Sequence, residues 1–235
     1  MSNNTSTLSS YIPGTEPIDT TLPNFYKTKF QGIVYDQKFS GLCVPCSLCL
    51  LKRIQVYLST NIILTFNPNY IYAYRNNSLY TGEGMNIVDG LKVLKSKGVS
   101  TINPKELEYY NYDKAVEELN KHKEEWDSEA ENYKIKGYFK VTKQIDTKRA
   151  IMTYGAVTSR IPDSDCLRNP TEPDGTSYII YDKPITGAIK YHQVTLIGWY
   201  NDYWIMQNSW GNAYGANGIV YLPMNYPIKE SYYCV

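Results

Sequence analysis

The segment VPCSLCLLKRIQVYL, from Val44 to Leu58, is the feature that most restricts how this chain can fold. Its apolar residues occupy nearly every face of a helix instead of a single stripe, which is typical of a helix buried in a core. Proline lacks an N–H group and is tolerated only in the first turn of a helix. Pro45 therefore predicts that this helix starts near residues 42–44, beside Cys43.

The pattern of the chain changes about half-way along. Segments with helical character come first, at residues 44–58, 84–96, 105–123 and 125–135. Segments typical of strands follow, and they read GYFKVT, GAVTSRI, SYIIYD, HQVTLIGWY, YWIMQNSW and GIVYL. We predict an α+β protein with a helical lobe mainly in residues 40–135 and a β-rich lobe mainly in residues 136–225.

Composition excludes some classes of function. The chain has 235 residues, of which 43% are hydrophobic, so it can bury a full core. Its net charge of +1 gives no reason to expect nucleic acid or an anionic membrane as a partner. No apolar run approaches the ~20 residues that span a bilayer. Five cysteines, an odd number with three clustered, argue against a secreted disulfide scaffold.

Three cysteines, Cys43, Cys46 and Cys49, are spaced as C-x-x-C-x-x-C and allow three interpretations. A structural zinc site needs four ligands, usually from two separated pairs, and the sequence has no second C-x-x-C. A redox pair is the second interpretation, but no recognisable thioredoxin-like βαβ unit follows this motif. We favour the third, a single nucleophile at Cys43, because a helix N-terminus lowers the pKa of a thiol there. Cys46 and Cys49 would then be small buried core residues.

A cysteine nucleophile needs a base, and histidine is the usual one. His192 begins an apolar strand, whereas the other histidine lies in a charged segment. Asn208 follows sixteen residues later, and its amide would hold the imidazole ring in place. A two-residue turn at Asn201 and Asp202 would place Asn208 opposite Thr195, so we expect a bulge or a longer turn that brings it level with His192.

The oxyanion formed during acyl transfer needs hydrogen-bond donors aimed at it. The backbone N–H group of Cys43, at the start of the helix, would be one donor. Gln37 lies six residues upstream, and its side-chain amide would be the second. Taken alone, Gln37 would be interpreted as an ordinary polar loop residue.

Together these residues resemble the papain-like cysteine peptidases. That family has Q-x-x-x-G-x-C before a long helix, a histidine that opens a strand, and N-S-W-G sixteen residues later. The matching residues here are Gln37, Gly41, Cys43, His192, Asn208, Ser209, Trp210 and Gly211. The spacing from the glutamine selects Cys43 over Cys46 as the nucleophile. The resemblance covers roughly residues 22–235.

The resemblance implies a papain-like fold with a helical left lobe, a barrel-like right lobe and an active-site cleft between them. It implies a cysteine endopeptidase that hydrolyses peptide bonds through a Cys43 thioacyl-enzyme. His192 would be the general base and acid, Asn208 would orient it, and Gln37 would bind the oxyanion. Cys43 and His192 would form a thiolate–imidazolium pair. We expect a protein or peptide substrate, no metal or other cofactor, no nucleic acid, no membrane, and a monomer.

The resemblance also places a set of residues at the substrate: Gly41, Gly84, Val88, Ala156, Arg160 and Trp210. Gly41 would leave room for the substrate backbone, and Gly84 would hydrogen-bond to it. Val88 and Ala156 would line the pocket for the second residue before the cut. Arg160 would lie near the floor of that pocket and favour an acidic side chain. Trp210 would shield the asparagine and histidine from water.

Two positions depart from the family pattern. Val44 stands where the family has tryptophan, and Ser40 stands where it has a cysteine, so the nearby disulfide of the family cannot form. The second change suits a reducing compartment. The chain also shows no long inhibitory prosegment, which makes it more similar to relatives from bacteria, archaea and large DNA viruses.

Residues 1–21 are polar, and we expect a flexible tail. At ~3.3 Å per residue it would extend roughly 65–70 Å, so it could enter the cleft as a short inhibitory pro-segment. A disordered end is the alternative. The segment has neither a basic start nor an apolar stretch, unlike a secretory signal. We expect a cytoplasmic, virion-associated or host-associated protein.

Two other functions fit the same residues. A catalytically silent papain fold would serve as a binding or structural protein, and its Cys43 would resist thiol labelling. A transferase or ligase would use the same acyl-enzyme but pass the acyl group to an amine in place of water. Product analysis with an added amine distinguishes this activity from hydrolysis.

Overall fold

The computed structural model describes residues 22–30, 32–170 and 190–235. Its helices are α1 (Cys43–Thr60), α2 (Pro68–Ala73), α3 (Ile87–Ser96), α4 (Tyr112–Ala130), α5 (Gln144–Tyr154) and α6 (Asp165–Arg168), with 3-10 turns η1 (Asn77–Leu79) and η2 (Glu131–Tyr133). Its strands are β1 (Phe25–Lys27), β2 (Tyr138–Val141), β3 (Val157–Asp163), β4 (Lys190–Tyr200), β5 (Tyr203–Gln207), β6 (Ile219–Pro223) and β7 (Glu230–Cys234). The predicted tail and the predicted strand SYIIYD lie outside the described residues.

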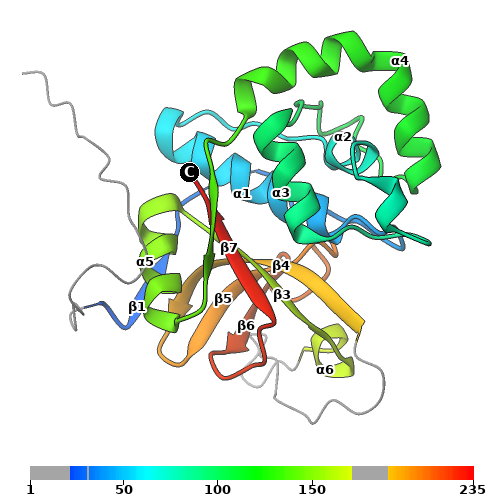
Figure 1. Ribbon diagram of the computed structural model, residues 1–235. Helices are drawn as coiled ribbons and strands as arrows, with labels where there is room; N and C mark the ends of the chain where they lie inside the picture. Colours follow the sequence, from blue (N-terminus) through cyan, green and yellow to red (C-terminus); the bar gives the residue numbers. More distant parts are fainter. Residues whose placement is uncertain (1–21, 31, 171–189) are drawn as a thin grey trace, which may run out of the picture.

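The helices and the sheet form two separate parts, as the α+β prediction requires. Helices α1 to α4 gather on one side of the molecule and the sheet lies on the other, where α5 packs against strands β7, β3 and β4 (Figure 1). Helix α1 lies between the two parts and contacts α2 and α3 on one side and β3 and β4 on the other. Among the described residues, none of the helices combines the length and the apolar character that a membrane crossing requires.

Helix α1 forms where the sequence predicts it. It begins at Cys43, two residues before Pro45, and ends where Asn61 takes a left-handed conformation with φ of 57°. Ten of the eleven positions from Val44 to Ile54 are buried, which is why the segment shows no single apolar stripe. Cys46 and Cys49 are 1% and 0% exposed, so both are core residues, as expected.

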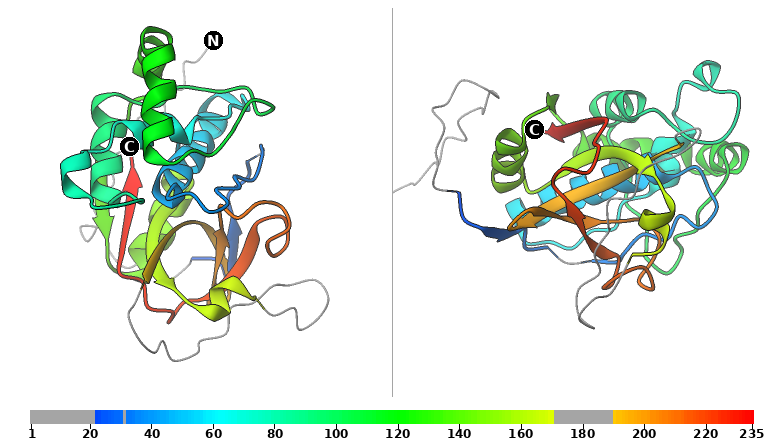
Figure 2. Two further views of the ribbon diagram at one scale, coloured as in Figure 1. Left: turned by 90° about the vertical axis from the view of Figure 1, so that its right-hand side faces the viewer. Right: turned by 90° about the horizontal axis from the view of Figure 1, so that it is seen from below.

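The seven-stranded antiparallel sheet has the order β2-β7-β3-β4-β5-β6, and β1 pairs with β4 outside this path. Figure 2 shows the sheet curled upon itself, which gives this lobe its barrel-like form. The register of β4 against β5 shifts between Leu196 and Gly198, so that Thr195 faces Gln207. Continued by one residue, this register places Asn208 opposite Val194 and not level with His192 as expected, but on the same face of the sheet, two residues away.

The structure corrects several sequence predictions. Residues 105–111 are not helical, and the break expected between the two helices of this region is a kink at His122, where the backbone of α4 departs from helical geometry. Neither α5 nor β7 was predicted, and β7 extends the sheet beyond residue 225. Two of the buried residues of α5, Asp146 and Thr147, are polar. This removes the apolar periodicity by which an amphipathic helix is found.

Candidate active site

The candidate nucleophile, Cys43, is the first residue of α1 and is partly buried. The N-cap residue Leu42 offers no side-chain acceptor, so the first N–H groups of the helix stay available to an anion. Burial raises the pKa of the Cys43 thiol, and the backbone N–H groups of Gln193, Val44 and Cys43 itself act in the opposite direction. The net effect is a raised pKa, because burial is the larger influence.

The candidate base, His192, lies near the start of β4 and is 5% exposed. Its Nε2 atom lies 2.6 Å from Oδ1 of Asn208, which leaves Nδ1 free to face the cleft. The ring of Trp210 stacks on the imidazole at 4.7 Å and 27°. Burial lowers the pKa of His192, and the hydrogen bond to Asn208 partly restores it. The stacked indole closes one face of the histidine, which agrees with the shielding role expected of Trp210.

These two shifts bear on the expected thiolate–imidazolium pair. Burial raises the pKa of Cys43 and lowers that of His192, and both changes favour the neutral pair. The ion pair therefore depends on the mutual attraction of the two groups and on the helix N-terminus. It stays a prediction, and the pH profile of the enzyme tests it.

Gln37 is held in a fixed orientation by two hydrogen bonds. Ser209 Oγ donates to Gln37 Oε1 at 2.6 Å, and Gln37 Nε2 donates to the carbonyl of Ser40 at 3.0 Å. The backbone N–H group of Gln37 also donates to the carbonyl of Ser209 at 2.8 Å. The residue is 6% exposed. Asn208 and Gln37 are therefore linked through Ser209, although they are far apart in sequence.

A buried polar cluster joins the nucleophile helix to the sheet that carries the base. Ser47 Oγ, one turn after Cys43, lies 2.7 Å from Thr158 Oγ1 on β3 and 2.8 Å from Thr195 Oγ1 on β4. Gln193 Nε2 donates to the same Thr158 hydroxyl at 2.7 Å. Because the members are buried and hydrogen-bonded, the cluster fixes how the two lobes meet beside the cleft.

Cys43 and His192 line the same cavity, of about 290 Å³, at the junction of the two lobes. The residues that line it are Cys43, Val44, Tyr80, Glu83, Gly84, Met85, Asn86, Ile87, Arg160, Tyr191, His192 and Gln193. The cavity therefore brings together the N-terminus of α1, the loop before α3, and the adjacent strands β3 and β4.

The structure changes the roles expected of two glycines. A Cβ atom on Gly41 would lie 2.3 Å from the backbone nitrogen of Gly84, so the space beside Gly41 is filled by the loop and not by a substrate. The N–H group of Gly84 donates to Tyr72 Oη, and its carbonyl accepts from Arg75. Gly84, with φ of +106°, lines the cleft, but its N–H group is already used.

Of three other expected substrate contacts, the structure places Arg160 at the cavity and Val88 and Ala156 outside its lining. Ala156 is fully buried in the core, and Val88 packs against that core and is absent from the cavity lining. Arg160 does line the cavity, where its guanidinium lies 4.3 Å from the ring centre of Tyr191. It also pairs with Glu230 at 3.3 Å. This pairing was not predicted, because the expected strands did not include β7.

The structure adds Met85, Glu83 and Tyr191 to the cleft. Within the described part of the chain, neither backbone group of Met85 has a hydrogen-bond partner, whereas both backbone groups of Gly84 are used. Glu83 is held by the Tyr72 hydroxyl at 2.6 Å. The segment TGEGMN, which contains Glu83, Gly84 and Met85, indicated that this loop lies at the cleft. The spacing of its residues did not identify which of them faces the cleft.

Residues 73–233 match the family model described as papain family cysteine protease. This match covers more than half of the chain. The chain belongs to the papain family of cysteine proteases. It is therefore a cysteine peptidase, a hydrolase that acts on peptide bonds. The matched range includes His192 and Asn208 but begins after Gln37 and Cys43, so the assignment of those two residues rests on the geometry described above.

Solved structures of low sequence identity share the papain-like fold. The cysteine protease xylellain from Xylella fastidiosa is 19% identical, with a TM-score of 0.68 over 91% of this chain and 86% of that one. Digestive procathepsin L 3 of Tenebrio molitor is 18% identical, with a TM-score of 0.72 over 96% and 72%. The Carica candamarcensis protease CMS1MS2, solved with E-64, is 15% identical, with a TM-score of 0.63 over 91% and 99%. A search of curated proteins finds no significant match.

Proposed function

We propose that this papain-family enzyme is an endopeptidase in which Cys43 is the nucleophile and His192 is the general base and acid. The observation that carries the proposal is the joint position of these two residues in one cavity, with the far nitrogen of His192 bonded to Asn208. Asn208 acts as a positioning residue through His192, and Gln37 supplies an oxyanion donor.

The acylation step follows from this geometry. The thiolate of Cys43 attacks the peptide carbonyl, and the carbonyl electron pair moves onto oxygen. The Cys43 N–H group and Gln37 Nε2 stabilise that oxyanion. When the intermediate collapses, the C–N bond breaks, and His192 gives its proton to the leaving amine. Asn208 Oδ1 keeps the ring oriented so that Nδ1 faces the nucleophile.

Deacylation repeats these steps with water. His192, now neutral, takes a proton from a water molecule that attacks the thioester. The tetrahedral intermediate uses the same oxyanion donors, and its collapse releases the acid and the Cys43 thiolate. All of these groups come from one chain, so a monomer is sufficient for the reaction. The net charge of +1 gives no reason to expect nucleic acid as a partner.

The position of Arg160 in the cavity supports the proposal that it contributes to substrate selection. Its pairing with Glu230 offsets part of its positive charge. We therefore expect only a moderate preference for an acidic side chain two residues before the cut. Equal cleavage of matched peptides with aspartate and leucine at that position would refute this preference.

Covalent labelling tests the proposed nucleophile. The wild type, Cys43→Ala and Cys46→Ala are treated with a peptidyl epoxide that alkylates active thiols, and the adduct is located by peptide mass mapping. We expect an adduct on Cys43 in the wild type and in Cys46→Ala, with peptidase activity lost only in Cys43→Ala. An adduct on Cys46 would refute the assignment, and a folded wild type without adduct or activity would show a silent papain fold.

A further inference from the structure

Phe39 is the most exposed large apolar side chain among the described residues. Its relative exposure is 106%, whereas that of the next such residue, Leu79, is 64%. Single exposed apolar residues are common on protein surfaces, and exposure alone does not indicate a function. The position of Phe39 is what makes it unusual, because it lies two residues after the proposed oxyanion donor Gln37 and four residues before Cys43.

Phe39 lies at the tip of a tight turn whose two ends are fixed to each other. The N–H group of Ser40 donates to the carbonyl of Gln37 at 3.0 Å, and Ser40 Oγ donates to the same carbonyl at 2.6 Å. Gln37 Nε2 donates back to the carbonyl of Ser40 at 3.0 Å. Lys38 and Phe39 are the two central residues of this turn. The turn therefore holds the Phe39 backbone in a fixed place beside Gln37.

The turn contains two departures from local preference. Lys38 has a φ of 51°, in the left-handed region that glycine adopts at little cost and other residues rarely adopt. Phe39 places an aromatic ring in water at a turn tip, where glycine, asparagine, aspartate and serine are the usual residues. Such departures are concentrated at functional sites, where they are offset by other interactions. Here they lie next to the proposed catalytic centre.

The turn is attached to the part of the active site that contains Trp210. Asp36, the residue before Gln37, forms a β-bridge with Trp210. The N–H group of Gln37 donates to the carbonyl of Ser209 at 2.8 Å. Trp210 in turn stacks on the ring of His192. The turn is therefore held against the loop that covers one face of the proposed base.

This part of the site is distinct from the 290 Å³ cavity. That cavity is lined by Cys43 and Arg160, whereas Gln37, Phe39 and Trp210 are all absent from its lining. The cavity is assigned above to the residues before the cut, through the proposed role of Arg160. The turn that carries Phe39 is then available to the residues after the cut.

The distance from Gln37 selects a position in the substrate. The Cα atoms of Gln37 and Phe39 are two residues apart and are separated by at most roughly 7 Å. An extended peptide advances ~3.3 Å per residue, so two substrate residues cover the same length. In the proposed mechanism the carbonyl that is attacked lies at Gln37 Nε2. The second residue after the cut is then level with Phe39.

We propose that Phe39 is a specificity-determining residue that binds an apolar side chain two residues after the cut. This inference rests on the proposed peptidase function. An aliphatic or aromatic side chain packed on the exposed ring removes apolar surface of both partners from water, and a polar side chain gains much less. The substrate class is therefore proteins or peptides with a large apolar residue at that position.

Two internally quenched peptides test the proposal. They are identical except for leucine or serine at the second residue after the cut, and mass spectrometry confirms that both are cut at the same bond. We expect the wild-type kcat/KM to favour the leucine peptide by about five- to tenfold. Phe39→Ala should bring this ratio close to one, and Phe39→Leu, which keeps an apolar side chain, should retain most of it. The ratio does not depend on how much of a variant is folded.

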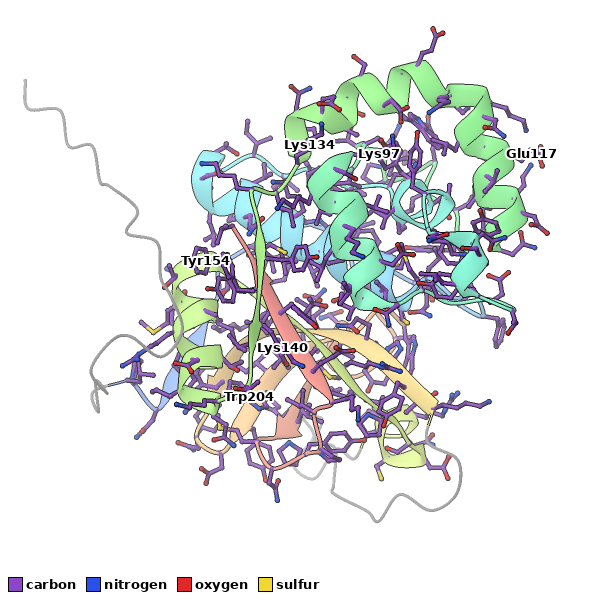
Figure 3. The ribbon with its side chains drawn as sticks, viewed as in Figure 1. Lys97, Glu117, Lys134, Lys140, Tyr154 and Trp204 are labelled. Atoms are coloured by element: carbon purple, nitrogen blue, oxygen red, sulfur yellow. The ribbon has the colours of Figure 1, made fainter. Side chains whose placement is uncertain are left out.

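Phe139→Ala supplies the matched control. Phe139 is 44% exposed and lies on β2, the strand that Lys140 marks in Figure 3, which two strands separate from the β4 strand of His192. Its leucine-to-serine ratio should equal that of the wild type. A short fluorogenic peptide with no amino acid after the cut measures the peptidase activity itself.

The outcomes separate this inference from the proposed function. If the wild type cuts the short peptide, three results would overturn this inference alone: a wild-type ratio near one, an unchanged ratio in Phe39→Ala, or an equal fall of the ratio in Phe39→Ala and Phe139→Ala. If folded wild type cuts none of the peptides, the proposed function is overturned and this inference with it.

Discussion

Replacement of Asn208 by alanine tests the architecture of the site most directly. The variant loses the 2.6 Å hydrogen bond to His192, which is buried with 5% exposure. In the transition state the imidazole is charged, and a hydrogen bond to a charged group contributes about 1.5–3 kcal/mol. At about 1.4 kcal/mol per tenfold change, we expect kcat/KM to fall by about 10- to 150-fold.

The same variant should change the pH profile in a defined direction. The hydrogen bond that His192 donates to Asn208 Oδ1 raises the pKa of His192, so its removal lowers that pKa further. The imidazolium that protonates the leaving group is then lost at a lower pH. The alkaline limb of kcat/KM should therefore move to lower pH in Asn208→Ala, a change that simple loss of folded protein would not produce.

The measurement is kcat/KM for a fluorogenic peptide from pH 4 to 10, on protein shown to be folded by urea unfolding. The control is Gln207→Ala, which removes a buried amide from the adjacent position, where Oε1 has no partner among the described residues. We expect the control to keep kcat/KM within about threefold and to leave the pH limbs in place. Equal losses in both variants, or an unshifted alkaline limb in Asn208→Ala, would refute the positioning role.

Three further changes test the packing around the cleft. Gly41→Ala should lower the free energy of unfolding by about 1–3 kcal/mol, because the new Cβ meets backbone, whereas Gly82→Ala meets nothing within 4 Å and should be close to neutral in urea. Ser47→Ala removes a buried hydroxyl with two threonine partners and should cost about 1–3 kcal/mol by the same assay. Glu230→Gln should free Arg160 and raise the cleavage of aspartate over leucine peptides several-fold, and an unchanged ratio would contradict the pairing.

The papain-like arrangement of His192 and Asn208 illustrates how local sequence limits tertiary geometry. A regular hairpin would place Asn208 opposite Thr195, three residues from His192 and on the other face of the sheet, so the sixteen-residue spacing required an irregularity. The register shift between Leu196 and Gly198 supplies it. Successive side chains of a strand point to opposite faces of the sheet, so the sequence spacing predicted that the pairing of β4 and β5 is irregular. The spacing did not predict where along the strands the irregularity lies.

Local chemistry also located the nucleophile. Proline is confined to the first turn of a helix, so Pro45 fixed the start of α1 within one residue of Cys43. Apolar residues on nearly every face of that helix predicted that it is buried in a core. These inferences depend only on neighbours in sequence, which is why they hold before any tertiary contact is known.

The substrate-facing residues were decided by tertiary structure. The loop at Gly84 fills the space beside Gly41, and Tyr72 and Arg75 bind the backbone groups of Gly84. Nothing in the local sequence links Gly84 to Tyr72 and Arg75. The pairing of Arg160 with Glu230 depends on strand β7, which lies 70 residues further along the chain. Local periodicity determines elements and their faces, whereas contacts between distant elements set the free hydrogen-bonding groups and charges that a substrate meets.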